Sequence, residues 1–165
     1  MKLFAFYIGG THELHDVRFV IASTLEETYE SLRQSWWGTP KSLHIDAWGI
    51  LESIEGYNIQ IRDAPAPEGN DQLFFVNLGG YTQKEFTELH KNVFVSATTP
   101  VKARAKALKM IQSWESPHKD YEYDIEEVVQ VESTINSNLH IHLIPTDHFK
   151  DFHFFCKRIP IGEKK

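Results

Sequence analysis

The chain of 165 residues contains a single cysteine, Cys156. It therefore cannot form an intramolecular disulfide, and a zinc site made of four cysteines is excluded. No stretch approaches the roughly 18 to 20 apolar residues that a membrane helix needs. The first residues also lack the small-residue cleavage pattern of a signal peptide. These absences predict a soluble, cytoplasmic protein without a membrane partner.

Positive charge is also scarce, because 17 basic residues stand against 23 acidic ones and the net charge is −6. Affinity for nucleic acid rests on clustered lysine and arginine, so nucleic acid is not expected as the main partner. The phosphate loop GxxxxGK(S/T), the GxSxG elbow and the HExxH motif are missing, and Gly9-Gly10 is too short for a dinucleotide fingerprint. No cofactor is evident, and an enzyme that uses NAD or ATP is not expected.

The chain does contain an internal repeat. LFAFYIGG and ELHDVRFVIAST in the first half return as LFFVNLGG and ELHKNVFVSATT in the second. Such a duplication defines the folding unit before any local element is assigned. It divides the chain into repeat one at 1–62, a linker at 63–71, repeat two at 72–144 and a C-terminal strand extension at 145–165. Because this length suits one well-buried core and is short for two, we expect a single domain, 1–165, with a shared core.

Each repeat begins with two predicted strands. The apolar run 2–8 ends at a Gly-Gly pair, which can adopt the positive φ of a turn, and the β-branched and aromatic residues of 17–22 form the second strand. The runs 73–78 and 93–97 repeat this pattern. In each copy we therefore expect a strand, a glycine turn and a second strand.

A helix is predicted next in each repeat. Thr24 and Thr99 occupy equivalent places as N-caps, the first with Glu27 in a capping box and the second followed by a proline at the first helical position. Apolar residues at helical spacing predict the buried faces, which are Leu25, Tyr29, Leu32 and Trp36 in the first helix and Val101, Ala105, Leu108 and Ile111 in the second.

A loop and a hairpin close each repeat, with strands at 49–54 and 57–61 in the first copy and at 128–132 and 139–143 in the second. The result is a tandem duplication of a β-β-α-β-β unit. The fold class is α+β, with a largely antiparallel sheet and two helices packed on it. Because sheets with exposed edges commonly pair with a second copy, a homodimer is among the expected assemblies.

The motifs LFxxxxGG, ELH and FVxA(S/T)T, together with a helix that ends in tryptophan, occur twice in the chain. This combination resembles the domain of unknown function 1543 family. The resemblance covers nearly the whole chain and implies two tandem copies of that domain. The family carries no established activity, so the resemblance implies no catalytic residue.

Topology predicts where chemistry would lie. If the first strand runs up, the second runs down and the helix returns, so the loop after the helix lies beside the start of the second strand. This gathers two related sets of polar residues, Glu13, His15, Asp16, His44 and Asp46 in repeat one and Glu88, His90, His118, Asp120 and Asp124 in repeat two. Imidazoles and carboxylates can bind a ligand or exchange protons near neutral pH. They can equally serve the fold by hydrogen-bonding free backbone groups of the turn.

His140 and His142 form an HxH pattern on a predicted strand. The spacing puts both imidazoles on one face, where they can supply two ligands to zinc or a similar divalent ion. Repeat one has Asn58 and Gln60 at the aligned positions, so the pair does not belong to the duplicated design. An exposed strand face is the alternative explanation.

Three classes of function follow from these features. The first is a binding or interaction module that uses the loop-rich edge to hold an unknown small molecule or protein. The second is a metal-dependent or acid/base hydrolytic enzyme that uses the histidine and carboxylate groups of that edge or of the HxH strand. The third is a purely structural component of an oligomer. Bound metal, or its absence, discriminates between the first two.

Overall fold

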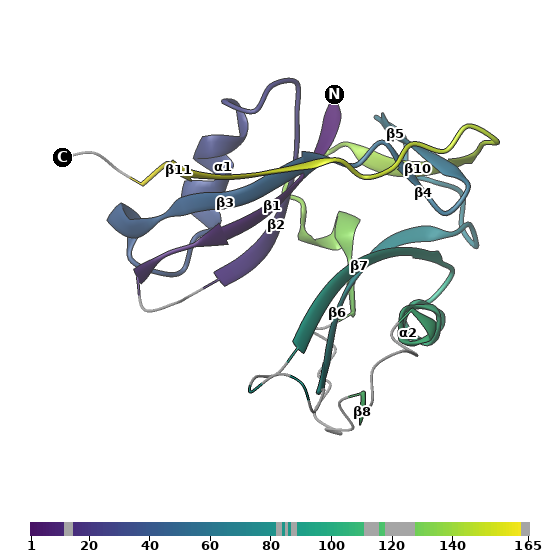
Figure 1. Cartoon of the computed structure of the whole chain (residues 1–165). Helices are drawn as coiled ribbons and strands as arrows, with labels where there is room; N and C mark the ends of the chain where they lie inside the picture. The colour runs from purple at the N-terminus through teal and green to yellow at the C-terminus, as the bar shows by residue number, and fades with distance from the viewer. Residues whose placement is uncertain are drawn as a thin grey trace. The chain divides into compact units, whose positions relative to one another are not determined.

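The computed structural model describes residues 1–11, 15–81, 84, 86, 89–110, 116–117 and 128–162. These residues contain two α-helices and eleven strands (Figure 1). The strands form three sheets, and all their strand pairs are antiparallel. The predicted α+β class is therefore confirmed. The chain divides into two compact units, unit 1 with Met1–Pro65 and Thr134–Lys165, and unit 2 with Ala66–Ser133. No helix in the described ranges is long and apolar enough to cross a membrane.

Unit 1 contains a four-stranded sheet in the order β11-β3-β1-β2, with helix α1 on one face (Figure 1). The bounds of these elements are β1 Lys2–Gly9, β2 His15–Ala22, α1 Thr28–Ser35, β3 His44–Ile50 and β11 Phe154–Pro160. Phe4, Phe6 and Ile8 alternate along β1 and form the core with Leu32 and Trp36, as the period of two in a strand requires. The two predicted strands of repeat one and the C-terminal strand are confirmed.

The buried face predicted for the first helix is confirmed, because Leu32 and Trp36 belong to this core cluster and the partly buried Leu25 and Tyr29 pack against it. The predicted start at Thr24 is wrong, since the helix begins at Thr28. The backbone N–H of Glu27 donates to Thr24 Oγ1 over 3.4 Å, and that of Ser23 donates to Glu27 Oε2 over 2.9 Å. These capping contacts close a turn that precedes the helix instead of capping the helix itself.

A second sheet of unit 1 has the order β10-β5-β4, with bounds β4 Ser53–Ile54, β5 Tyr57–Arg62 and β10 His140–Pro145. The hairpin predicted for repeat one has its turn between 54 and 57, and the structure confirms that turn, because Glu55 and Gly56 take φ values of 43° and 82° between β4 and β5. The hairpin predicted for 128–132 and 139–143 is wrong. Val128–Gln130 pairs with β6, the strand Gln72–Tyr81 of unit 2, and β10 pairs with β5. The second pairing places two apolar residues of β10 opposite two of β5, which stabilises a sheet more than a short polar turn does.

Unit 2 contains β6, which pairs with β7, β8 and β9, and helix α2, which contacts β6, β7 and β9. The bounds are β6 Gln72–Tyr81, β7 Leu89–Ala97, α2 Pro100–Lys109, β8 Ser116–Pro117 and β9 Val128–Gln130. Its core cluster includes Phe74, Val76, Val95, Ala103 and Ala107. The predicted strands 73–78 and 93–97 are therefore confirmed within β6 and β7.

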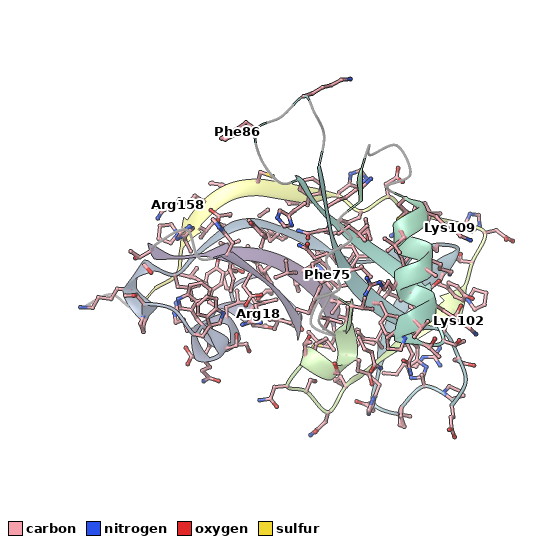
Figure 2. All side chains as sticks on the ribbon, turned by 90° about the horizontal axis from the view of Figure 1, so that it is seen from below. Arg18, Phe75, Phe86, Lys102, Lys109 and Arg158 are labelled. Carbon is pink, nitrogen blue, oxygen red and sulfur yellow. The ribbon has the colours of Figure 1, made fainter. Side chains whose placement is uncertain are left out.

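The buried face predicted for the second helix is wrong. Val101 is 78% exposed and Leu108 36% exposed, whereas Ala103 and Ala107 are fully buried. Alanines allow a helix to approach the sheet closely, and the larger residues of α2 then face outward with Lys102 and Lys109, which mark its two ends in Figure 2. Ile111, the fourth residue of the predicted face, lies outside the described residues.

Thr99 is the N-cap of α2, as predicted. Its Oγ1 accepts the backbone N–H of Lys102 over 3.3 Å, and Pro100 takes the first helical position. We expect Thr99→Ala to lower the free energy of unfolding by about 1 kcal/mol, because the helix loses a partner for one free N–H. Urea denaturation followed by circular dichroism measures this loss. Thr98→Ala is the control, since Thr98 Oγ1 accepts only a side-chain bond from Lys102 Nζ among the contacts described. Equal losses in both variants would contradict the assignment.

Candidate functional site

The polar residues of unit 1 meet around Gly9, at the end of β1. Gly9 pairs with His15 of β2 on one side and with His44 of β3 on the other, and directly opposite residues share a face of the sheet. A Cβ atom on Gly9 would lie 2.8 Å from Asp46 Oδ2 and 2.9 Å from His15 Cδ2. The missing side chain therefore leaves the space in which these two side chains approach each other.

The role of this glycine differs from the predicted one. Positive φ angles occur at Gly56 and Gly69 among the described glycines, not at Gly9 or Gly10. A Cβ on Gly10 would lie 2.6 Å from Trp36 Cζ2. The Gly9-Gly10 pair is thus needed for close approach of side chains, and the predicted left-handed turn at this pair is wrong.

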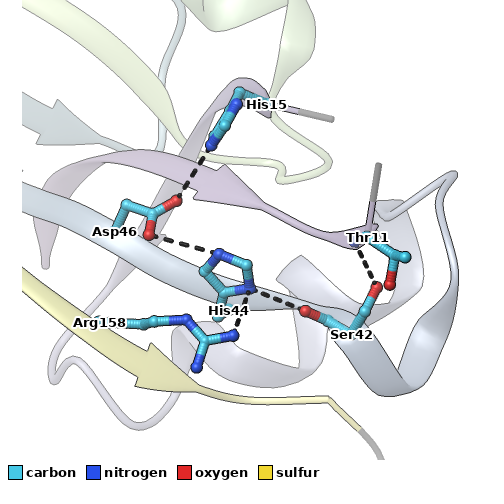
Figure 3. Close-up of polar contacts among 6 residues, drawn as sticks. All are labelled: Thr11, His15, Ser42, His44, Asp46 and Arg158. Atoms are coloured by element: carbon cyan, nitrogen blue, oxygen red, sulfur yellow. Dashed lines mark hydrogen bonds and ion pairs between the residues drawn. The ribbon is translucent and has the colours of Figure 1, made fainter. Parts of the chain in front are cut away.

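Asp46 is the extra residue of a β-bulge. Tyr7 pairs with Ala47 and Ile8 with Ile45, so between these pairs β3 advances by two residues while β1 advances by one. A bulge of this kind redirects a side chain and increases the local twist, and bulges are common beside functional sites. Here the bulge carries the Asp46 carboxylate to a position between His15 and His44 (Figure 3).

We call His15, His44 and Asp46 the polar cluster. His44 Nε2 lies 3.4 Å from Asp46 Oδ1, and His15 Nε2 lies 3.7 Å from Asp46 Oδ2. Both distances exceed the usual N–H···O range of about 2.7–3.2 Å. Asp46 Oδ2 is buried and has no hydrogen-bond partner among the described residues, although the side chain as a whole is 29% exposed. The cluster therefore holds a carboxylate oxygen whose hydrogen-bonding capacity is unused.

The loop before β3 fixes the ring of His44. Its Nδ1 lies 2.8 Å from the carbonyl oxygen of Ser42, and because a carbonyl only accepts, Nδ1 carries a hydrogen and donates. Nε2 is then the atom directed at Asp46 (Figure 3). Ser42 is held in turn, since its Oγ donates to the Thr39 carbonyl over 2.8 Å and accepts the Thr11 N–H over 3.0 Å. His44 is 12% exposed and serves as the rigid side of the cluster.

Tyr7 and Arg158 border the polar cluster. The ring of Tyr7 stacks on that of His15, with centroids 5.1 Å apart and planes 4° apart. Burial, and then the negative charge of Asp46, raises the pKa of Tyr7, so its phenol keeps its proton at neutral pH. Arg158 of β11 brings its Nη2 to 3.5 Å from His44 Nδ1, which places a positive charge beside that ring. The cluster is thus a carboxylate flanked by rings and one guanidinium.

Asp16 does not join the polar cluster. It follows His15 on β2 and pairs with the core residue Ile8, so its side chain lies on the opposite face of the sheet. There Asp16 Oδ2 forms an ion pair of 2.7 Å with Arg18 Nη2 and accepts a hydrogen bond of 3.0 Å from Trp37 Nε1. These contacts connect the start of β2 to the segment after α1.

Five candidate residues lie outside the described residues: Glu13, Glu88, His118, Asp120 and Asp124. The described candidate of unit 2 is His90, which pairs with Gly79 as His15 does with Gly9. Its Nδ1 lies 3.3 Å from Asn77 Oδ1, and Asn77 Nδ2 donates to Asn92 Oδ1 over 2.8 Å. The described neighbours of His90 therefore include the amide side chains of Asn77 and Asn92, whereas those of His15 include a carboxylate and a tyrosine.

The HxH pair lies on β10 and is divided between two roles. His142 is buried, and its Nε2 lies 2.7 Å from the Ala64 carbonyl, so this nitrogen must carry a hydrogen and cannot bind a metal at the same time. The exposed-face explanation is therefore wrong for His142, which holds the segment after β5. His140 pairs with Arg62 at the end of β5. In the part of the chain that the structure describes, no group of three histidine, cysteine or acidic residues could hold a metal ion.

Sequence reasoning missed three contributors to the site. Gly9 was visible as half of the Gly-Gly pair, but its signal indicates a turn as readily as close approach. Tyr7 precedes Gly9 by two residues, and the strand period could have placed it on the same face. Arg158 had no sequence signal, because the pairing of β11 with β3 joins segments far apart in the chain.

Comparison with known protein families finds a match to part of the chain. The family described as Domain of Unknown Function (DUF1543) matches residues 10–61, which include all three residues of the polar cluster. Only one copy of the domain is matched. No curated protein sequence matches the chain.

A particular solved structure is also similar to this chain. It is the crystal structure of a protein Il1583 from Idiomarina loihiensis, which is 25% identical in sequence, with a TM-score of 0.72 over 98% of this chain and 99% of that one. The α+β fold of the whole chain therefore occurs in a second protein.

Proposed function

We propose that the protein is a binding module and that the polar cluster is its ligand site. The observation that carries this proposal is the buried Oδ2 of Asp46, for which the described part of the chain supplies no hydrogen-bond donor. A buried polar group left without a partner costs about 1–3 kcal/mol or more when charged. A ligand that reaches this oxygen past the side chain of His15, which is 36% exposed, and donates an N–H or O–H to it would remove that cost. The cluster is therefore better suited to hold a ligand than to stabilise the fold alone.

The surroundings narrow the chemistry of the ligand. The stacked rings of Tyr7 and His15 offer a flat surface, and the protonated phenol can donate to an acceptor on the ligand. Arg158 adds a positive charge that disfavours a cation beside His44. We therefore expect a neutral small molecule that carries hydroxyl or amide groups.

The test is a thermal-shift screen of sugars, polyols, nucleosides and small amides, followed by calorimetry on the compounds that raise the melting temperature. We expect Asp46→Asn to weaken binding at least about tenfold, because a hydrogen bond to a charged group contributes about 1.5–3 kcal/mol. Asp16→Asn is the matched control, since its carboxylate lies at the same end of β2 on the other face of the sheet. It should bind as the wild type does.

Two outcomes would contradict the site assignment. One is equal affinity in the wild type and in Asp46→Asn. The other is an equal loss in Asp46→Asn and in Asp16→Asn, which would indicate damage to the fold. His15→Ala and His90→Ala compare the two units, and we expect only the first to weaken the response.

The second candidate function is acid/base or metal-dependent hydrolysis. The observation that favours it is the Asp46 carboxylate with an imidazole on each side, since such pairs move protons near neutral pH. Three experiments test this function. They are elemental analysis, a titration with divalent metals in the wild type and in His140→Ala, and assays with nitrophenyl esters and phosphates. An enzyme of this kind requires bound metal or hydrolysis that His15→Ala abolishes, and the absence of both would exclude it.

We further infer that the chain is a two-copy member of the matched family. Support comes from equivalent pairings, because Gly9 opposes His15 as Gly79 opposes His90. Phe4 and Phe74 likewise oppose residues of a strand C-terminal to the helix of each unit, β3 in the first and β9 in the second. The single shared domain, the cytoplasmic location, the homodimer and the structural role in an oligomer stay predictions.

A further inference from the structure

Unit 1 contains a pocket of about 490 Å³ at the other end of β1 from the polar cluster. Its apolar walls are lined by Leu3, Ile50, Leu51, Ile59 and Ile61. Leu3 and Leu51 are buried, and the Leu51 N–H donates to the Leu3 carbonyl over 2.9 Å. The Ile59 N–H likewise donates to the Glu52 carbonyl over 2.9 Å. Backbone hydrogen bonds therefore hold the walls of the pocket in place.

Charged residues lie at the rim of the pocket. Lys2, Glu52 and Lys150 all line it, so the side-chain charges there are two positive and one negative. Lys150 Nζ lies 2.8 Å from Glu52 Oε1, and both side chains are more than half exposed, at 62% and 57%. A surface pair of this kind is weak and can exchange one partner for another. The rim thus has a net positive charge that an anionic group of a ligand can approach.

We propose that this pocket binds a small amphipathic anion, an apolar chain or ring that carries one carboxylate. The volume lies in the range of about 300–1,000 Å³ that is typical of small-molecule sites. Ile59 and Ile61 share one face of β5, where they contact the apolar part, and Lys2 and Lys150 contact the carboxylate. This site shares no residue with the polar cluster and does not depend on the function proposed for it.

The first test uses decanoate and decyltrimethylammonium as probes of opposite charge on the same chain. Methyl NMR of the isoleucines, recorded during a titration of the full chain, should show shifts at Ile50, Ile59 and Ile61 with decanoate. Ile144 of β10 does not line the pocket and should keep its position. The ammonium probe should bind at least about fivefold more weakly, as one unfavourable charge contact near the surface predicts. Equal affinity for both probes, or shifts confined to residues outside the pocket, would overturn the proposal.

The second test uses variants. Ile59→Trp should fill the pocket and weaken decanoate binding at least about tenfold, whereas Ile144→Trp should leave it unchanged. If Ile59→Trp fails to fold, Lys150→Glu becomes the test of the proposal, because Lys150 is exposed and its replacement leaves the core intact. We expect Lys150→Glu to weaken decanoate about fivefold and to strengthen the ammonium probe. Unchanged affinities in Lys150→Glu would contradict the proposed role of the rim, and decanoate binding retained in a folded Ile59→Trp would exclude the pocket.

Discussion

Replacement of Trp36 by alanine is expected to lower the free energy of unfolding by about 3–5 kcal/mol, the range measured for loss of a large buried aromatic residue. Trp36 is 8% exposed and belongs to the core cluster of unit 1. Cβ atoms on Gly10 or Gly38 would each lie 2.6 Å from its Cζ2. Two glycines thus leave the space for one indole, and smaller side chains at position 36 leave a cavity.

Trp37→Ala is the matched control for this loss. Trp37 is 57% exposed and donates one hydrogen bond to Asp16, so we expect a loss of about 1 kcal/mol or less. Urea denaturation measures the free energy of unfolding of both variants. The melting temperature of Trp36→Ala should fall by roughly 6–20 °C, because each kcal/mol lowers it by about 2–4 °C. Equal losses for the two neighbours would show that the indole of Trp36 does not fill the core as described.

The second large effect is expected at Gly49, where alanine should lower the free energy of unfolding by about 1–3 kcal/mol through overpacking. A Cβ atom there would lie 2.5 Å from Phe152 Cε2 and 2.7 Å from the carbonyl oxygen of His153. The phenyl ring can rotate away, but the carbonyl is backbone and moves only if the chain that enters β11 moves with it. The pairing of β11 with β3 would therefore loosen.

Variants at Gly56 are the control for overpacking at Gly49, because at Gly56 the cost of replacing glycine comes from the backbone angle and not from a steric clash. Its φ is +82° and a Cβ there would meet nothing within 4 Å, so Gly56→Ala is costly only through its backbone angle. Asparagine tolerates that angle, and Gly56→Asn should recover part of the stability lost in Gly56→Ala. Gly49→Asn should instead be less stable than Gly49→Ala, because it adds atoms to a filled space. Urea denaturation of the four variants tests this order, and a more stable Gly49→Asn would contradict it.

The helix α2 illustrates how far the repeat could be used for prediction. Thr24 and Thr99 are 75 positions apart, and so are the buried pairs Thr28 with Ala103 and Leu32 with Ala107. The offset relates the buried residues of the two helices, but applied to the face predicted for α1 it recovers Ala107 and not Ala103. Hydropathy alone favoured Val101 and Leu108, because it does not register that small side chains lie where a helix comes closest to a sheet.

The candidate site was predictable in part. The order of strand, strand and helix brought His15 near the segment of His44 and Asp46, as expected from chain direction. Asp16 was grouped with them by sequence proximity, although neighbours on a strand face opposite sides. The bulge that carries Asp46 and the approach of Arg158 depend on how β3 pairs with β1 and β11. No local pattern encodes those registers.

The sequence by itself determined the features that depend on neighbouring residues, namely the N-cap at Thr99, the turn at Gly56, the strands that alternate apolar residues and the α+β class. Only the tertiary structure decided that β10 pairs with β5, that Gly9 permits close contact and that Asp46 Oδ2 has no donor among the residues that the structure describes. The physical reason is the distance along the chain over which the interactions act. Backbone angles and capping depend on a few adjacent residues, whereas strand pairing and burial are decided by competition among segments distant in the chain.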